Sequence, residues 1–218
     1  MKKYIAIATL LAAGSAFANA EEYTASTPDK TNQGNYYGFC LAFDNGTLLT
    51  TDVPTGVQLN LDSITLLTRN DGSTSNMMKI AVYEYTGDNT TGTFLGSSSV
   101  TTFATDANIT LTFDDITVNS SNRYQFLYVK ADASAEKLAT FNGYKEVAIQ
   151  WGVAVTDDFS SNIPSGWGTY KSSGINSWEG QYVPVVSFKL STIPEPSTFG
   201  LLAGLGALAL VGARRRRK

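Results

Sequence analysis

Residues 109–114 read Ile-Thr-Leu-Thr-Phe-Asp, and this stretch decides the class of fold. Its apolar members are Ile109, Leu111 and Phe113, and its polar members are Thr110, Thr112 and Asp114. Successive side chains of a β-strand point to opposite faces of a sheet, so this alternation is typical of a strand that is buried on one face only. We therefore expect a β-sheet that covers a hydrophobic core.

Related patterns occur on both sides of this stretch. Residues 149–156 alternate in the same way, whereas residues 124–129 are mostly apolar at both parities, which predicts a central strand covered on both faces. Further strand candidates occupy residues 36–43, 57–67, 78–86, 94–103 and 183–190, and turn-forming clusters of Asn, Asp, Gly and Ser separate many of them.

Composition supports the same fold class. Between residues 21 and 193, Ser and Thr number 42 against 27 charged residues, a balance that favours strands over helices. About eight strands at this spacing predict an all-β fold, a two-sheet β-sandwich of the jelly-roll type. The segments 79–85, 92–97, 109–113 and 123–129 resemble galactose-binding and other carbohydrate-binding jelly rolls of exported bacterial proteins, which implies the same architecture.

Composition also excludes several classes of function. The 218-residue chain contains no histidine, which excludes Ser-His-Asp and Cys-His catalytic systems and imidazole metal sites. Cys40 is the single cysteine, so an internal disulfide cannot form, and we expect this residue to be a small buried hydrophobe. Residues 21–193 hold 18 of the 19 acidic residues but nine of the 16 basic ones, which argues against nucleic acid as a partner.

The N-terminal segment 1–20 has the parts of a secretory signal peptide. A basic start precedes an apolar run at residues 5–13, and the segment ends in Ala18-Asn19-Ala20, an A-x-A cleavage site. We expect cleavage after Ala20, so that the exported chain begins at Glu21.

The C-terminal segment 194–218 has three ordered parts. Pro194, Glu195 and Pro196 are followed by an uncharged apolar run at residues 199–213 and then by Arg214, Arg215, Arg216, Arg217 and Lys218. Fifteen helical residues span about 22 Å against roughly 30 Å of hydrocarbon, so the expected transmembrane helix is short. The basic tail 214–218 is expected to stay in the cytoplasm and to leave the domain 21–193 outside.

These C-terminal residues resemble the PEP-CTERM sorting signal, which combines a Pro-Glu-Pro motif, a short apolar helix and an arginine-rich end. In that family the signal is read by an exosortase, a membrane protease that processes the tail during delivery to the cell surface or extracellular matrix. The resemblance implies that Pro194, Glu195 and Pro196 are recognition residues for such an enzyme, and that the chain contacts the membrane through its C-terminal helix.

Two pairs of adjacent carboxylates, Asp114-Asp115 and Asp157-Asp158, are candidates for glycosidase chemistry. A glycosidase needs an acid and a nucleophile or base on opposing walls of a sugar site, whereas adjacent residues of a strand point to opposite faces. We therefore expect Asp114 and Asp115 to lie at the end of a strand, and we expect the protein not to be an enzyme.

The chain implies no organic cofactor, but its loops leave calcium open. Oxygen ligands could come from Asn70, Asp71 and Asn76, or from Asp157, Asp158 and Asn162. Neither set has the Asp-x-Asp-x-Asp-Gly spacing of a strong calcium motif, and turn chemistry explains the same residues equally well.

The stretch 167–182 is rich in Gly and Ser and contains Trp167, Tyr170, Trp178 and Tyr182. Aromatic faces that protrude from loops can stack on the C–H faces of sugar rings, so these four are candidate glycan-binding residues. The alternative is that they cover one end of the sandwich core, since Trp is highly buried on average.

Together these features predict an exported, non-enzymatic protein of the cell envelope or extracellular matrix, with a structural or polysaccharide-binding role. The alternative is a secreted carbohydrate-active enzyme. We expect residues 21–34 to be a loosely attached polar segment and residues 191–198 to be a linker between the domain and the tail.

Overall fold

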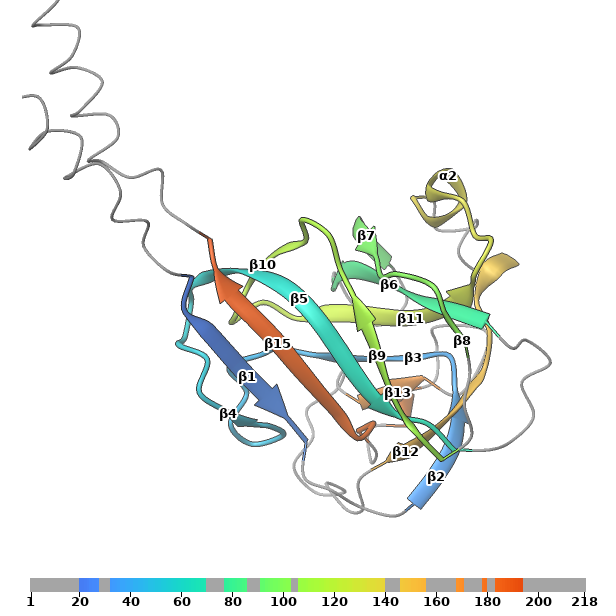
Figure 1. Cartoon of the computed structure of the whole chain (residues 1–218), viewed down its shortest axis with the longest axis horizontal. Helices are drawn as coiled ribbons and strands as arrows, with labels where there is room; N and C mark the ends of the chain where they lie inside the picture. Colours follow the sequence, from blue (N-terminus) through green and yellow to red (C-terminus); the bar gives the residue numbers. More distant parts are fainter. Residues whose placement is uncertain are drawn as a thin grey trace, which may run out of the picture. The chain divides into compact units, whose positions relative to one another are not determined.

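The computed structural model describes residues 20–27, 32–69, 77–85, 91–102, 106–139, 146–155, 168–170, 178–179 and 183–193. The chain divides into two compact units: one is Glu22–Ser191, the domain, and the other consists of Met1–Glu21 and Thr192–Lys218. The described part of the domain contains two main sheets, a separate strand pair and a short helix (Figure 1).

The first main sheet, sheet 1, contains the first and last strands of the domain. Its members are β1 (Glu22–Ser26), β4 (Thr50–Thr51), β5 (Gln58–Leu67), β9 (Asn108–Thr112), β10 (Thr117–Asn119) and β15 (Val186–Thr192). The strand order is β10-β5-β15-β1-β4, and β9 also pairs with β5. Thus β1 and β15, which are far apart in the sequence, are antiparallel neighbours (Figure 1).

The second main sheet, sheet 2, has the strand order β14-β13-β3-β11-β6-β7, with β8 also paired to β6. Its members are β3 (Gly38–Leu41), β6 (Met77–Tyr85), β7 (Thr91–Ser97), β8 (Thr101–Thr102), β11 (Tyr124–Lys130), β13 (Gly168–Tyr170) and β14 (Trp178–Glu179). A separate antiparallel pair joins β2 (Asn32–Tyr36) to β12 (Trp151–Val155), and the short helix is α2 (Ala135–Leu138).

The main hydrophobic core lies between sheets 1 and 2. Phe188 of β15 contacts Phe126 of β11, with ring centroids 5.6 Å apart, and meets the Phe43 ring edge to face at 5.1 Å. Phe39 of β3 stacks on Phe126 at 4.8 Å. Burial of each such ring contributes roughly 1.5–3 kcal/mol to folding. Two facing sheets with a shared core agree with the β-sandwich that the sequence predicted.

Strand β11 is covered on both faces, as its sequence predicted. It lies between β3 and β6, and its residues from Tyr124 to Val129 are all buried. Phe126 belongs to the main core, whereas Leu127 and Val129 belong to a smaller cluster on the opposite face. Leu138 of α2 packs into that cluster.

The expectation that residues 21–34 form a loosely attached segment is wrong. Most of this segment is strand, because β1 pairs with both β15 and β4 and β2 pairs with β12. Ala25 is fully buried, and Tyr23 packs against the main core. The few apolar residues of β1 are on one face, so pairing with neighbouring strands, more than its own hydrophobicity, fixes this strand.

The strand predicted at residues 94–103 is divided into β7 and β8. Between these strands the backbone N–H of Ser99 donates to the Thr112 carbonyl oxygen of sheet 1 at 2.7 Å, so the chain leaves sheet 2 there. The expected linker at residues 191–198 is also corrected in part, because Ser191 and Thr192 are the last residues of β15.

Candidate functional site

The two ends of the domain meet at the edge of the β1–β15 pair. Glu22 lies opposite Ser191 in the register of these strands. Just beyond this pair, the Glu21 N–H donates to Oγ1 of Thr192 at 2.9 Å, and the Thr192 N–H donates to the Glu21 carbonyl oxygen at 2.9 Å. The chain therefore enters and leaves the domain on neighbouring strands.

The residues predicted for signal cleavage and sorting flank these two strands. Ala20 and Glu21 are exposed, next to the start of β1, whereas Ala18 lies outside the described residues. The sorting residues Pro194, Glu195, Pro196, Arg214, Arg215, Arg216 and Arg217 also lie outside them.

The apolar segment 199–213 lies outside the described residues too. In the part of the chain that the structure describes, no helix is long and apolar enough to span a membrane.

Two of the four predicted glycan-binding residues are brought together by the backbone. Tyr170 of β13 lies directly opposite Trp178 of β14, and β13 continues sheet 2 beside β3. Trp167 and Tyr182 lie outside the described residues. No strand was predicted in this stretch, so these two short strands were missed.

The carboxylates Asp114 and Asp115 are exposed and lie between the end of β9 and the start of β10. Asp115 has a φ of 56°, which places it in the left-handed region that Asp tolerates in turns. This position confirms that the pair follows the end of a strand. Asp157 and Asp158 lie outside the described residues.

Among the described residues, no group of three Cys, Asp or Glu side chains is placed to hold a metal ion. The residues that could supply calcium ligands, Asn70, Asp71, Asn76, Asp157, Asp158 and Asn162, lie outside the described part. Calcium binding therefore stays a prediction of the sequence.

Sequence reasoning missed a pocket of about 400 Å³ on sheet 1. Its lining comes from β1, β4, β5, β9 and β15 and from residues next to them, and includes none of the residues singled out from the sequence. Most of its polar side chains are short Ser and Thr groups that are scattered along the chain. Such residues carry no motif, and only the pairing of distant strands brings them together.

Comparison with known families identifies the tail. Residues 192–217 match the family described as the PEP-CTERM protein-sorting motif. The chain carries this motif where its Pro-Glu-Pro, apolar and arginine-rich segments predicted it. Comparisons with curated proteins and with solved structures found no match.

Proposed function

We propose that this is a non-enzymatic exported protein, processed by an exosortase-type enzyme, with a structural or polysaccharide-binding role at the cell envelope or in the extracellular matrix. Residues 1–20 are its signal peptide, and residues 21–193 are the exported domain. In residues 194–218, the apolar helix 199–213 holds the chain in the membrane during delivery. The sorting motif at residues 192–217 is the observation that carries this proposal.

The junction between domain and motif supports this role. β15 ends at Thr192, and Pro194 follows two residues later, so the recognition residues begin almost where strand pairing ends. Pro194 and Pro196 have no backbone N–H and restrict the residues before them, which favours an extended backbone. An extended chain is the form that a protease can bind along its active site.

The polysaccharide-binding and non-enzymatic parts have separate support. The register of β13 and β14 places Tyr170 opposite Trp178, so two candidate sugar-stacking residues are neighbours. The lack of histidine removes the commonest general base of hydrolases. If the purified protein released soluble sugars from a polysaccharide, the non-enzymatic part of the proposal would be wrong. The alternative, a secreted carbohydrate-active enzyme, would then take its place.

The decisive experiment replaces Pro194, Glu195 and Pro196 together by alanine in the producing cell. We expect export to continue while an uncleaved, membrane-bound form accumulates. Since alanine could also extend the apolar helix, the matched control places Gly-Ser-Gly at the same positions. If both variants reach the surface processed like the wild type, the sorting assignment fails and a plain C-terminal anchor replaces it.

A second measurement tests export on its own. N-terminal sequencing of protein recovered from outside the cytoplasm should begin at Glu21. An intact Met1 on that material would refute the signal peptide and leave the sorting motif to be explained in another way.

A further inference from the structure

The pocket on sheet 1 is built around a row of hydroxyl groups. The register places Ser26 of β1 opposite Ser187 of β15 on one side and opposite Thr50 of β4 on the other. Along their strands these residues alternate with buried ones such as Ala25 and Val186. Alternation therefore places the three hydroxyls on the face of sheet 1 that points away from the main core.

Strands β9 and β5 extend the row. Thr65 lies opposite Thr110, and their hydroxyl oxygens are 2.8 Å apart. Thr65 lines the same pocket as Ser26, Ser187 and Thr50. Since neighbouring strands are about 4.8 Å apart, the row from β9 to β4 extends over roughly 19 Å. This length suits an extended chain better than a compact small molecule.

The pocket hydroxyls have hydrogen-bonding capacity to offer a ligand. Within the described part of the chain, the side chains of Ser26, Thr50 and Ser187 make no hydrogen bond. A hydroxyl donates one hydrogen bond and accepts up to two, so it can match either role of a sugar hydroxyl. The exposed amide of Asn108 adds both a donor and an acceptor.

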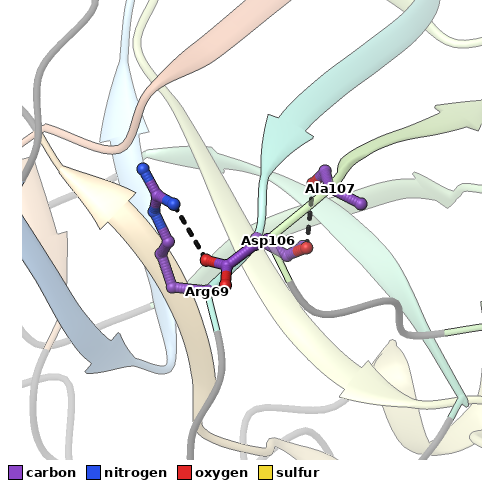
Figure 2. A network of polar contacts seen from close by, with 4 residues as sticks. Arg69, Asp106 and Ala107 are labelled. Atoms are coloured by element: carbon purple, nitrogen blue, oxygen red, sulfur yellow. Dashed lines mark hydrogen bonds and ion pairs between the residues drawn. The ribbon is translucent and has the colours of Figure 1, made fainter.

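Polar contacts join the end of β5 to the residues before β9, next to the pocket; Figure 2 shows the contact between Arg69 and Asp106. Arg69 Nη1 lies 2.8 Å from Asp106 Oδ1, and the Thr68 N–H and hydroxyl both donate to the Ala107 carbonyl oxygen at 2.9 Å. These contacts follow directly after Leu67, which lines the pocket. Thr68 is fully buried, so its two hydrogen bonds order this wall of the pocket, and an ordered wall lowers the entropy cost of binding.

The described part of the lining favours an uncharged ligand. The described residues that line the pocket include no Asp, Glu, Lys or Arg, and the charges of Arg69 and Asp106 offset each other beside it. A charged group that entered the pocket would lose hydration without gaining an opposite charge. Leu67 and Val185 add apolar surface to the hydroxyls. Sugar rings combine C–H faces with hydroxyl edges, which this mixture complements.

We infer that this pocket binds neutral sugar units of a polysaccharide. The inference rests on the polysaccharide-binding part of the proposed function, and it adds sheet 1 as a contact surface separate from the aromatic stretch 167–182. The polymer lies along the hydroxyl row, with one sugar unit in the pocket and the next over Thr110.

The test measures binding of the full chain, in a detergent without a sugar headgroup, to immobilised dextran, mannan, galactan and β-glucan. Alginate, an anionic polysaccharide, is the comparison. Ser187→Ile fills the pocket from an exposed strand position, where a β-branched residue is well tolerated. Thr24→Ile is the matched control, because Thr24 is exposed on the adjacent strand β1 but does not line the pocket.

We expect the wild type and Thr24→Ile to bind at least one neutral polymer equally well and to prefer it to alginate. Ser187→Ile should bind that polymer at least about tenfold more weakly. Thermal unfolding establishes that each variant is folded. If Ser187→Ile unfolds, Thr50→Val takes its place, since it removes one hydroxyl with little change in volume.

The outcomes separate the pocket from the proposed function. Equal binding by Ser187→Ile and Thr24→Ile would show that the pocket is not the binding site, while polysaccharide binding itself would stand. Stronger binding to alginate than to the neutral polymers would overturn the inference that the ligand is neutral. If the wild type binds none of the polymers, the polysaccharide-binding role itself is wrong, and the pocket inference fails with it.

Discussion

Ser98 and Ser99 follow each other in the chain but hydrogen-bond to different sheets. Ser98 Oγ accepts from the Ile80 N–H of β6 at 2.9 Å, in sheet 2, whereas Ser99 Oγ accepts from the Thr112 N–H of β9 at 3.1 Å, in sheet 1. These two residues therefore connect β6 of sheet 2 to β9 of sheet 1.

We predict that Ser98→Ala destabilises the protein by about 1–3 kcal/mol, because it leaves the N–H of buried Ile80 without its acceptor. Ser99→Ala is the matched control and should change stability by about 0.5 kcal/mol or less, since Ser99 is exposed and water can replace its hydroxyl. Urea unfolding of both variants measures the difference. Equal losses would contradict the separate roles of the two serines.

Gly38 of β3 is required by the close approach of β11. A Cβ added at this position would collide with the backbone carbonyl oxygen of Phe126, which cannot move without disturbing the centre of sheet 2. We predict that Gly38→Ala costs about 3 kcal/mol or more. Gly46→Ala, where no atom lies within 4 Å of the added carbon, should be almost neutral. Similar denaturation midpoints for the two variants would show that β3 and β11 can move apart enough to accept the added carbon at little cost.

Tyr128 gives a prediction about alkaline pH. Burial raises the pKa of its hydroxyl, and the nearby Tyr36 adds to this effect. The folded protein thus keeps this proton above pH about 10, where an unfolded tyrosine loses it, so stability present below that pH is lost as the pH rises. Tyr128→Phe should make the fall in stability above pH about 10 less steep.

The same substitution should also stabilise the protein near neutral pH. The Tyr128 hydroxyl oxygen is buried and has no hydrogen-bond partner within the described part of the chain. Its removal relieves an unsatisfied polar group, for a gain of about 1 kcal/mol. Urea unfolding of the wild type and variant across the alkaline range checks both effects. Parallel pH profiles with equal stability would show that another group satisfies this hydroxyl.

Cys40 is expected to resist thiol reagents in the folded protein. Its side chain is 1% exposed, as the sequence predicted for a small apolar residue in a strand. Modification should therefore be slow under native conditions and rapid in denaturant. Rapid labelling of the native protein would show that the covering of sheet 2 opens near β3.

The main strands could be predicted wherever hydrophobic pattern and burial agree. Residues 124–129 are mostly apolar at both parities, and β11 is buried on both faces because a hydrophobic cluster packs against each face. β1 was not predicted, although Tyr23 and Ala25 alternate with Glu22 and Thr24, because five residues with only two apolar side chains are a weak strand signal. Its place depends on β15, a partner that no local window of sequence contains. The jelly-roll variant of the sandwich stays a prediction.

The sorting motif and the pocket also differ in how far the sequence could predict them. The sorting motif at residues 192–217 is read from contiguous sequence and was predicted with its three parts. The pocket depends on the alignment of Ser26 with Ser187 and Thr50, which come from three separate parts of the chain. Serine and threonine are common on exposed strands, so only the register distinguishes these residues from other surface hydroxyls.

The pairing of Glu22 with Ser191 also determines how the domain responds to force. Both ends of the domain leave it next to the Glu22–Ser191 pair, at one end of the β1–β15 strand pair. A force that pulls the two ends apart therefore acts on the hydrogen bonds at this end first. The hydrogen bonds then break one after another, as in a zipper, instead of sharing the load as they would in shear. The domain should yield at low force when it is stretched by its ends, starting with the separation of β15 from β1.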